Sequence, residues 1–251
     1  MREILGGINS VTEALRGQRK FHKIYVEQER HNPRIEEILV LAQKKSVPIK
    51  TSSRKDLERL YPQAPHQGVV AEVEPYVYTE LDDIVAKASS EEGSILLVLD
   101  GIENPQNLGS IIRTAECAGV KGIILPRHRS VGVTPAVVRA SAGATEHTAV
   151  VQETNLVNTL KTFKKAGFWV IGADMTGKQE YFHTQMPYPA VLVIGSEGRG
   201  IRRLVRENCD LLVRIPMFGQ VNSLNASISA ALLIYELVRQ KKNVEKLADN
   251  G

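Results

Sequence analysis

Residues Ile215-Pro-Met-Phe-Gly-Gln-Val-Asn-Ser-Leu-Asn-Ala-Ser227 join the end of an apolar strand to the start of a long apolar helix. Three polar side chains in this stretch, Asn222, Ser223 and Asn225, lie beside the free backbone N–H groups that a helix start exposes. Capping by Asn or Ser explains one such residue well and three of them poorly. The stretch therefore predicts one half of a binding site, and its partner is to be sought upstream.

The segments upstream of this stretch indicate an α/β sheet. Near-continuous apolar runs, typical of strands covered on both faces, recur from residue 94 onward. They are Ser94–Leu99, Gly122–Leu125, Thr148–Val151, Phe168–Gly172, Ala190–Ile194 and Leu211–Ile215. Helical patterns lie between most of them, notably at 108–118 and 155–166. This alternation predicts a mostly parallel sheet.

Residues 1–74 form a smaller block in which strands and helices also alternate. Ser10–Glu13 has the form of a capping box that opens a helix through Leu15, and Asn32-Pro33 provides a cap and an N1 proline for a second helix. A third helix is predicted at 53–60, and strands are predicted at 23–26, 47–50 and 68–73. The pattern favours a compact three-layer α/β module. His66-Gln-Gly68 is predicted to be a turn held by side-chain hydrogen bonds, with ligand contact as the alternative.

Charge divides the chain at residues 75–92. This segment holds 1 Lys or Arg against 5 Asp and Glu, whereas residues 1–74 hold 13 against 10 and residues 93–251 hold 18 against 13. Thr79–Asp82 is expected to cap a helix through about Ala88, and the polar stretch Ser89–Gly93 suits a boundary. We therefore expect a domain at 1–74, a linker at 75–92, a second domain at 93–243 and a tail at 244–251.

Composition excludes several classes of protein. The net charge of +4 is compatible with an RNA partner but is weak evidence taken alone. No window approaches the roughly 18 continuous apolar residues of a membrane span, and the start lacks the apolar core of a signal peptide, so a cytoplasmic protein is expected. Cys117 and Cys209 lie far apart in apolar segments, which favours two buried reduced thiols over a disulfide or a metal pair. The six histidines show no ligand spacing, and no metal is expected.

Three loops that follow predicted strands combine glycine with amide, carboxylate or guanidinium groups. In such sheets ligands bind beyond the carboxyl ends of the strands, and glycine lets a backbone approach a ligand closely. The loops are Asp100–Arg113, Gly195–Gly200 and the stretch from Ile215 to Ser227. Neither GxxxxGK[ST] nor GxGxxG is present, which disfavours NTP hydrolysis, nicotinamide enzymes and Rossmann-type methyltransferases. Ser196 and Ser223 lack a histidine at nucleophile-elbow spacing, which disfavours serine hydrolysis.

Asn107 and Arg113 are polar candidates within the first loop. They are six residues apart, about one and two-thirds helical turns, so they need not share a face if the helix already begins at Asn107. An irregular turn at Gly109 would let both reach one pocket. Spacing alone thus predicts a polar pocket built from three loops, with its ligand unknown.

The same three loops resemble the three motifs of the SpoU (TrmH) branch of the knotted SPOUT RNA methyltransferases. The matching stretches, in order, are Asn104–Ala115, Val193–Ile201 and Ile215–Ser227. The first block, with Leu5–Leu15 and His66–Ala71, resembles the small ribosomal-protein-like RNA-binding domain of bacterial enzymes that methylate a guanosine 2′-hydroxyl in 23S ribosomal RNA. The resemblance implies a deep trefoil knot, S-adenosyl-L-methionine (AdoMet) as the cofactor and a homodimer formed through the knot region.

The resemblance also implies roles for single residues. The residues that would meet the adenosine of AdoMet, mainly through backbone groups, are Gly195, Ile215 and Leu224. The residues that would serve methyl transfer to a ribose 2′-oxygen are Asn107, Arg113, Glu197, Ser223 and Asn225. Because arginine stays protonated, we expect Arg113 to favour the alkoxide electrostatically, although family proposals include a role as base. Asn107 would orient Arg113 or the ribose, and Glu197 would fix Arg113 or the substrate. The alternatives are a structural Arg113–Glu197 ion pair and helix capping at 223–225.

The expected function is therefore AdoMet-dependent methyl transfer to the ribose 2′-hydroxyl of a guanosine in 23S ribosomal RNA. The alternatives are a tRNA ribose methyltransferase, a resistance-type methyltransferase acting on an adenosine of ribosomal RNA, and a non-catalytic RNA-binding ribosome-assembly factor. The first block disfavours the tRNA enzyme, because the family's tRNA enzymes usually carry short terminal helices in its place. Phosphate contact is expected for Arg199, Arg202, Arg203 and Arg206. Residues 226–238 are apolar on nearly all sides, which predicts a buried helix, part of it an interface.

Overall fold

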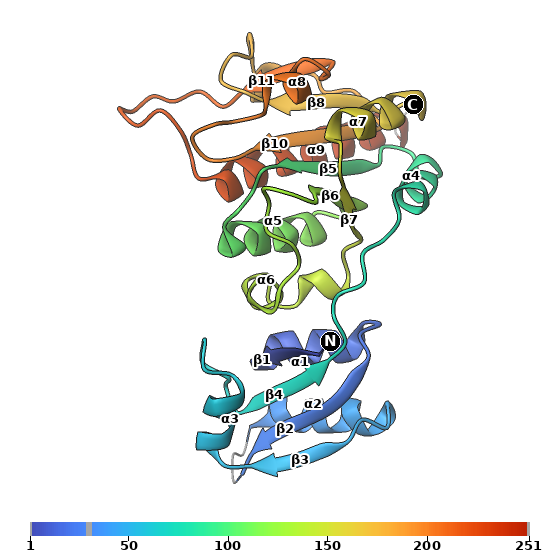
Figure 1. Ribbon diagram of the computed structural model, residues 1–251. Helices are drawn as coiled ribbons and strands as arrows, with labels where there is room; N and C mark the ends of the chain where they lie inside the picture. Colours follow the sequence, from blue (N-terminus) through green and yellow to red (C-terminus); the bar gives the residue numbers. More distant parts are fainter. Residues whose placement is uncertain (1, 29–31, 250–251) are drawn as a thin grey trace. The chain divides into compact units, whose positions relative to one another are not determined.

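The computed structural model describes residues 2–28 and 32–249 of the chain. Its contacts divide the chain into two compact units (Figure 1). The first comprises residues 1–77 together with 133–147, and the second comprises residues 78–132 and 148–251. The first unit thus takes in a segment from the middle of the chain. The boundaries at 74, 92 and 243 stay predictions.

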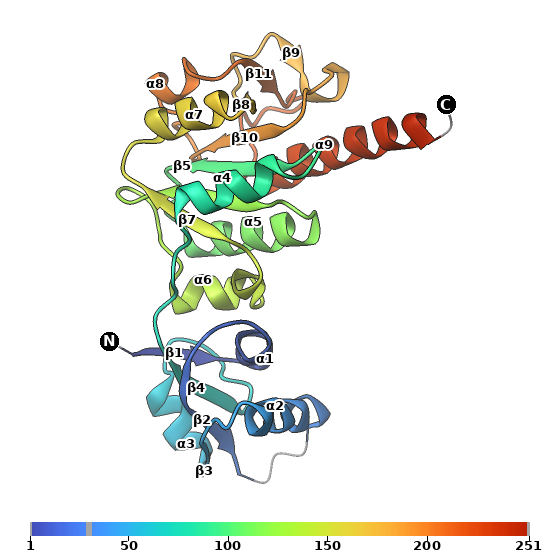
Figure 2. The ribbon, with the colours of Figure 1, turned by 90° about the vertical axis from the view of Figure 1, so that its right-hand side faces the viewer.

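A four-stranded sheet in the order β1-β4-β2-β3 forms the centre of the first unit. Its strands are β1 (Glu3–Gly6), β2 (Phe21–Glu27), β3 (Ile49–Ser52) and β4 (Val69–Val73). β4 pairs antiparallel with β1 and β2, while β3 runs parallel to β2. Helices α1 (Ile8–Arg16) and α2 (Pro33–Lys44) pack together on one face, and α3 (Arg54–Leu60) covers the other (Figure 2). The predicted three-layer module is confirmed.

The start of α1 corrects the predicted capping box. The helix begins at Ile8, two residues before Ser10, and its N-cap is Gly7 with φ 99°. The Ile8 N–H donates to Gln67 Oε1 at 2.9 Å, so a side chain distant in sequence satisfies this helix start. The predicted turn at His66–Gly68 is confirmed, because His66 Nδ1 accepts the Gly68 N–H at 3.0 Å. β3 also begins two residues later than predicted.

Residues 133–147 belong to the first unit through a buried ion pair. They form α6 (Pro135–Ala140), which packs against β1, and the 3-10 turn η1 (Ala144–Glu146). Arg19 Nη2 donates to Glu146 Oε1 at 2.7 Å, and both side chains are only 4% exposed. Arg19 Nη1 also donates to the Glu74 carbonyl at 3.2 Å. The sequence had not predicted these two elements, whose burial depends on distant partners.

A seven-stranded sheet in the order β7-β6-β5-β10-β8-β11-β9 forms the second unit. Its strands are β5 (Ile95–Asp100), β6 (Gly122–Pro126), β7 (Val150–Glu153), β8 (Trp169–Ala173), β9 (Gln179–Glu180), β10 (Ala190–Gly195) and β11 (Leu211–Arg214). Every pairing between these strands is parallel, so the predicted parallel sheet and its six strands are confirmed. β9 was missed because it spans two residues. The chain order reverses between β5 and β10, and ligands bind at such a switch point.

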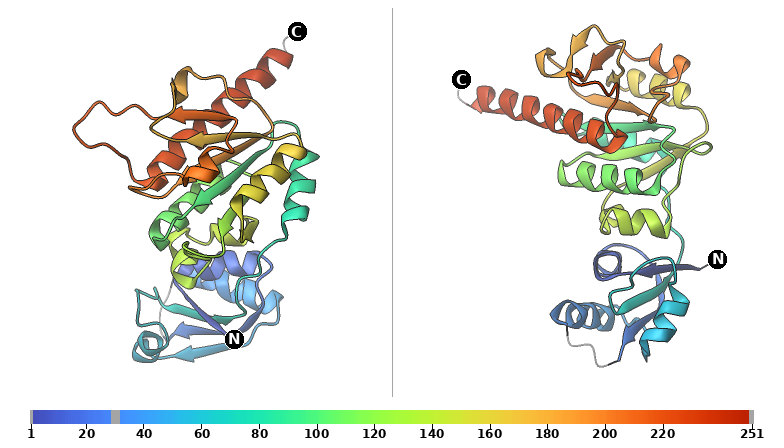
Figure 3. Two further views of the ribbon diagram at one scale, coloured as in Figure 1. Left: turned by 45° about the horizontal axis from the view of Figure 1, so that its top comes forward. Right: turned by 90° about the vertical axis from the view of Figure 1, so that its left-hand side faces the viewer.

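Helices cover both faces of this sheet. α4 (Leu81–Ser89), α7 (Leu156–Lys165) and α8 (Arg203–Arg206) bury residues such as Val98 and Val193 on one face. α5 (Pro105–Cys117) and α9 (Ala226–Asp249) lie together on the other face, where α9 packs against β10 (Figure 3). A short 3-10 turn, η2 (Tyr181–His183), follows β9. Within the described residues no helix is long and apolar enough to cross a membrane.

Several helix predictions need correction. α4 occupies half of the predicted linker at 75–92, but its N-cap is Glu80, which makes no side-chain capping bond, rather than Thr79. α9 continues through most of the predicted tail to residue 249, and residues 250 and 251 lie outside the described part. The expected burial of Cys117 was wrong, because this thiol is exposed on α5. α9 is likewise not buried on all sides, since Tyr235 is 50% exposed.

Candidate active site

Glu197 joins the three loops that the sequence singled out. Its Oε1 accepts a hydrogen bond from Asn107 Nδ2 at 2.8 Å and another from Asn225 Nδ2 at 2.7 Å. The backbone N–H of Ala226 donates to the same oxygen at 3.2 Å. The carboxylate therefore lies at the start of α9, where a helix favours an anion. One oxygen atom thus holds together residues from all three stretches.

Asn107 and Asn225 complete this cluster. Asn225 Nδ2 also donates to Asn107 Oδ1 at 2.9 Å, so the amides and the carboxylate form a closed triangle. Asn225 Oδ1 accepts bonds from the backbone N–H and the hydroxyl of Ser227 at 2.8 and 2.6 Å. Asn225 is thus both a cap of α9 and a member of the cluster. Asn107 is only 8% exposed, and its two amide atoms are both bonded, which fixes its orientation.

Glu197 keeps one oxygen for a ligand. In the part of the chain that the structure describes, its Oε2 has no hydrogen-bond partner, while Oε1 accepts all three bonds. A tight turn presents this side chain: Ser196 and Gly200 exchange backbone hydrogen bonds of 3.2 and 2.9 Å. Gly198, at the tip of the turn, has φ 80°, a conformation that glycine adopts without strain. The carboxylate is therefore oriented through one oxygen and available through the other.

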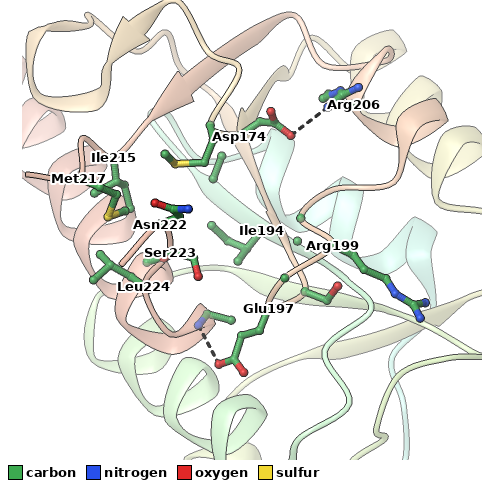
Figure 4. A pocket seen from close by; sticks show the side chains of 18 of the residues that line it. Asp174, Ile194, Glu197, Arg199, Arg206, Ile215, Met217, Asn222, Ser223 and Leu224 are labelled. Atoms are coloured by element: carbon green, nitrogen blue, oxygen red, sulfur yellow. Dashed lines mark hydrogen bonds and ion pairs between the residues drawn. The ribbon is translucent and has the colours of Figure 1, made fainter. Parts of the chain in front are cut away.

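A first cavity of about 400 Å³ opens beyond the ends of β8, β10 and β11. It is lined by the predicted cofactor residues Gly195, Ile215 and Leu224, together with Ser223 and Glu197. Figure 4 shows Ile215, Ser223 and Leu224 on one wall and Glu197 reaching toward the start of α9. The structure thus brings together all three residues that the resemblance assigned to the cofactor.

Gly195 is required by the close approach of two backbone segments. A Cβ atom at this position would lie 2.1 Å from the carbonyl carbon of Gly200 and 2.3 Å from the nitrogen of Ile201. Real Cβ atoms do not approach backbone atoms so closely, so the turn after β10 folds against β10 only because residue 195 has no side chain. The wall of the first cavity depends on this contact.

A second cavity of about 360 Å³ adjoins the first. Its own lining includes Asp100, Glu103, Asn107, His128 and Arg129. The residues that line both cavities are Ser196, Glu197, Arg199, Gly200 and Ala226. The turn that carries Glu197 is therefore the shared wall, and a ligand in either cavity can reach the Glu197 side chain.

Arg113 is not part of this cluster. α5 is a regular helix from Pro105, so six residues turn Arg113 about 120° away from Asn107. Arg113 is exposed, lines neither cavity and, among the described residues, has no ion-pair partner. Neither the irregular turn at Gly109 nor the alternative of a structural ion pair with Glu197 is present within one chain.

Three of the four arginines after the second motif already have carboxylate partners. The buried Asp100 carboxylate accepts two hydrogen bonds from Arg202, one from its backbone N–H at 2.8 Å and one from its side-chain Nε at 2.6 Å. Arg203 pairs with Glu207 at 2.8 Å, and Arg206 Nη1 lies 3.5 Å from Asp174. Phosphate contact by these arginines stays a prediction. Arg199 is the member of the group that has no ion pair within the described ranges.

Asp174 and the loop after β6 were missed by the sequence-based prediction. Asp174 follows β8 directly and lines the first cavity, and its side chain is 9% exposed. Arg129 and His128 follow β6 and line the second cavity. Both positions come directly after the carboxyl end of a strand, so a comparison of every strand end would have found them.

The Cys209 thiol is largely buried and is not suited to act as a nucleophile. Burial raises the pKa of the Cys209 thiol to about 12, which keeps it protonated at neutral pH. Within residues 2–28 and 32–249, no three His, Cys, Asp or Glu side chains lie close enough to hold a metal ion.

Comparison with known proteins matches both units. Residues 94–235 match the SpoU rRNA Methylase family, and residues 4–79 match the domain described as RNA 2′-O ribose methyltransferase substrate binding. The chain is 43% identical over 239 residues to YacO of Bacillus subtilis (strain 168), which is assigned to the TrmH family of tRNA/rRNA methyltransferases. This match covers 95% of the chain and 96% of that protein.

Solved structures agree with this assignment. The SpoU methyltransferase AviRb from Streptomyces viridochromogenes, in complex with AdoMet, is 25% identical with a TM-score of 0.80, covering 96% of this chain and 91% of that one. The AdoMet-bound rRNA methyltransferase from Sinorhizobium meliloti is 26% identical with a TM-score of 0.80, covering 95% and 87%. Because the family match covers residues 94–235, which include the three loops that meet at Glu197, the chain belongs to the SpoU rRNA methylase family of RNA methyltransferases.

Proposed function

We propose that this protein transfers the methyl group of AdoMet to the ribose 2′-hydroxyl of a guanosine in 23S ribosomal RNA, and that it works in the cytoplasm as a homodimer. The observation that carries the proposal is the pair of cavities that meet at Glu197. One cavity suits the methyl donor and the other suits the nucleotide that accepts the methyl group. The match of residues 4–79 to a substrate-binding domain of RNA 2′-O ribose methyltransferases supports the choice of a ribose hydroxyl.

The first cavity fits AdoMet. Gly195 lets the Gly200–Ile201 backbone pack against β10 and so shapes one wall of the cavity, and Ile215 and Leu224 provide apolar contact on another wall. Two of the solved relatives are described as bound to AdoMet. When bound, AdoMet supplies an electrophilic methyl group on a positively charged sulfur. Ser223 and Asn222 line the same wall and offer hydrogen bonds that orient the cofactor.

The chemistry requires loss of a proton from the ribose. The 2′-oxygen forms a bond to the methyl carbon while the bond from that carbon to sulfur breaks, and the hydroxyl proton leaves. A 2′-hydroxyl is a poor nucleophile at neutral pH, so alignment with the methyl group and a nearby proton acceptor both matter. The free Oε2 of Glu197 lies on the wall shared by both cavities and is suited to accept that proton. Asn107 and Asn225 hold the carboxylate in place.

Arg113 is proposed to act in the active site of a second copy of the chain. The exposed side of α9 carries Ile228, Leu232 and Tyr235 at helical spacing, and these side chains are 51%, 37% and 50% exposed. Such a row of apolar side chains is suited to a two-fold interface. α5, which carries the exposed Arg113, packs beside α9. A homodimer through this face brings Arg113 of one copy to the site of the other, where its fixed charge favours the alkoxide.

The trefoil knot is also part of this proposal. The loop at 195–201 and the stretch at 215–227 lie together at the hydrogen bond between Asn225 and Glu197, and this proximity supports the threading of one beside the other. The resemblance of both stretches to the motifs of knotted methyltransferases supports the same threading.

Labelled AdoMet tests the function directly. The protein is incubated with unmodified 23S ribosomal RNA and with unmodified tRNA, and the RNA is then digested to nucleosides. We expect label in 2′-O-methylguanosine from the ribosomal RNA. Absence of label from both RNAs would refute the enzymatic proposal, and label in tRNA alone would refute the ribosomal substrate.

A further inference from the structure

The second cavity presents charges that the protein does not neutralise. Asp100 is paired with Arg202, and the bonded oxygen of Glu197 accepts three hydrogen bonds. In contrast, Glu103, Arg129 and Arg199 line the cavity without an ion-pair partner among the residues described. The cavity thus offers the Glu103 carboxylate, the unbonded oxygen of Glu197 and two free guanidinium groups to a ligand.

The Glu103 carboxylate and one guanidinium are held by loops that are bonded to each other. Glu103 follows Ile102, whose carbonyl accepts the Val131 N–H at 2.9 Å and the Ser130 hydroxyl at 3.0 Å. Arg129, next to Ser130, has φ 57°, an uncommon conformation for a residue with a side chain. Such backbone strain persists only where the surrounding structure holds it, and it clusters at functional sites. The positions of Glu103 and Arg129 are therefore linked through the backbone.

The Glu103 side chain makes no hydrogen bond or ion pair among the described residues that would stabilise the fold. The cap of α5 is its neighbour Asn104, whose Oδ1 accepts the Gln106 N–H at 2.8 Å. The Glu103 side chain is exposed and makes no hydrogen bond within the described ranges. A carboxylate that lines a cavity and neither pairs with nor caps any of the described residues is available for recognition.

We infer that Glu103 reads the base of the nucleotide that accepts the methyl group, and that it selects guanine. This inference rests on the proposed function. RNA that is recognised by sequence is mostly single-stranded, and its unstacked bases expose their edges to the protein. On such an edge guanine carries two adjacent donors, the N1–H and the 2-amino group. A carboxylate accepts both in parallel, whereas the other three bases place an acceptor where guanine has the N1–H or the amino group.

The remaining charges and the size of the cavity fit the same ligand. The volume of about 360 Å³ lies within the range of small-molecule sites and suits one nucleotide. Arg129 and Arg199 suit the phosphates on either side of that nucleotide, because a guanidinium pairs with phosphate oxygens in a fixed geometry. The ribose then lies toward the shared wall, where Glu197 faces both cavities.

A first experiment replaces the carboxylate. Glu103→Gln keeps the shape of the side chain but offers one acceptor and one donor to guanine's two donors. We expect kcat/KM for 23S ribosomal RNA to fall about 10- to 100-fold, the range that a lost bidentate base contact produces. AdoMet affinity, measured by calorimetry, should stay unchanged. The matched control is Glu92→Gln. Glu92 is an exposed carboxylate that precedes β5, whereas Glu103 follows the carboxyl end of that strand.

A second experiment alters the base instead of the protein. After the modified guanosine is mapped, a transcript is prepared with inosine at that single position, which removes only the 2-amino group. We expect the wild-type protein to methylate the inosine transcript about 10-fold more slowly than the guanosine transcript. Glu103→Gln should show little further loss with inosine, because the protein variant and the altered base remove the same interaction.

The outcomes separate this inference from the function on which it rests. A wild-type protein that labels no RNA defeats the proposed function. A wild-type protein that forms 2′-O-methylguanosine but treats inosine and guanosine alike defeats the inference alone. Equal loss with inosine in the wild type and in Glu103→Gln also overturns it, since the two changes would then act independently. The inosine comparison in the wild type needs no variant and holds even if Glu103→Gln folds poorly.

Discussion

Two inactive variants should restore activity to each other if Arg113 acts in the site of a partner copy. The variants are Arg113→Ala and Glu197→Ala. Glu197 lies on the wall between the two cavities of its own chain, whereas Arg113 lies outside both cavities on α5. Each variant alone should lose at least about 100-fold in turnover. Glu197→Ala removes the group that accepts the 2′-hydroxyl proton, and Arg113→Ala removes the charge that favours the alkoxide.

The size of the recovery follows from the division of residues between chains. In a mixed dimer, one site receives both alterations and the other receives neither. Random pairing of equal amounts makes about half of all dimers mixed, and one of the two sites in each is intact. The mixture should therefore show about one quarter of wild-type activity. Mixed dimers isolated with two different affinity tags should show about one half.

The assay is methyl transfer from labelled AdoMet to 23S ribosomal RNA by tag-purified mixed dimers. The matched control combines Asn107→Ala with Glu197→Ala. These two residues share a 2.8 Å hydrogen bond within one chain, so every site of that mixed dimer has one altered residue and no recovery is expected. Mixed Arg113/Glu197 dimers that are no more active than their parents, although both parents bind AdoMet and dimerise, would refute the proposed role of the partner copy.

Three further predictions follow from the packing. Gly195→Ala should weaken AdoMet binding at least about 10-fold in calorimetry because its Cβ meets backbone at 2.1 Å, whereas Gly219→Ala, which meets nothing within 4 Å, should not. Glu146→Ala should lower the free energy of unfolding by about 1.5–3 kcal/mol in urea, because the buried Arg19 loses its two hydrogen bonds to this carboxylate and keeps only Glu3 and the Glu74 carbonyl as partners. Hydrogen bonding from a neighbouring arginine lowers the pKa of Glu236 below its ordinary 4.5. Its contribution to stability is therefore present above pH 4.5 and lost as the pH falls through the lowered pKa, so Glu236→Gln should flatten the acid side of a plot of melting temperature against pH.

The strands of the second unit could be read from the sequence because each is buried on both faces. A strand such as β10 has helices on both sides, so nearly every residue from Ala190 to Gly195 is apolar. β9 has two residues and carries no such run, so it could not be found. Helix starts were predictable where the cap is local, as at Asn32, whose side chain accepts the Arg34 N–H. The start of α1 was not, because its partner is Gln67.

The candidate site was likewise predictable from the sequence only in part. Gly195, Glu197 and Asn225 stood out because polar groups and glycine directly follow apolar strands, which is a local pattern. That Glu197 joins the three loops depends on β10 lying between β5 and β8, an order that no local pattern expresses. The linkage of the Arg129 loop to Ile102 likewise depends on the pairing of β5 with β6.

By itself, the sequence determined a parallel α/β fold and the three stretches that build its site, because burial and loop chemistry are written residue by residue. Only the tertiary structure decided which of those residues meet. Asn107 and Arg113 stand six residues apart in one motif, and the regular geometry of α5 turns the first toward Glu197 and the second toward solvent. The physical reason is that a contact depends on the rotation of a helix and on the order of strands in a sheet, and both are set by packing between distant parts of the chain.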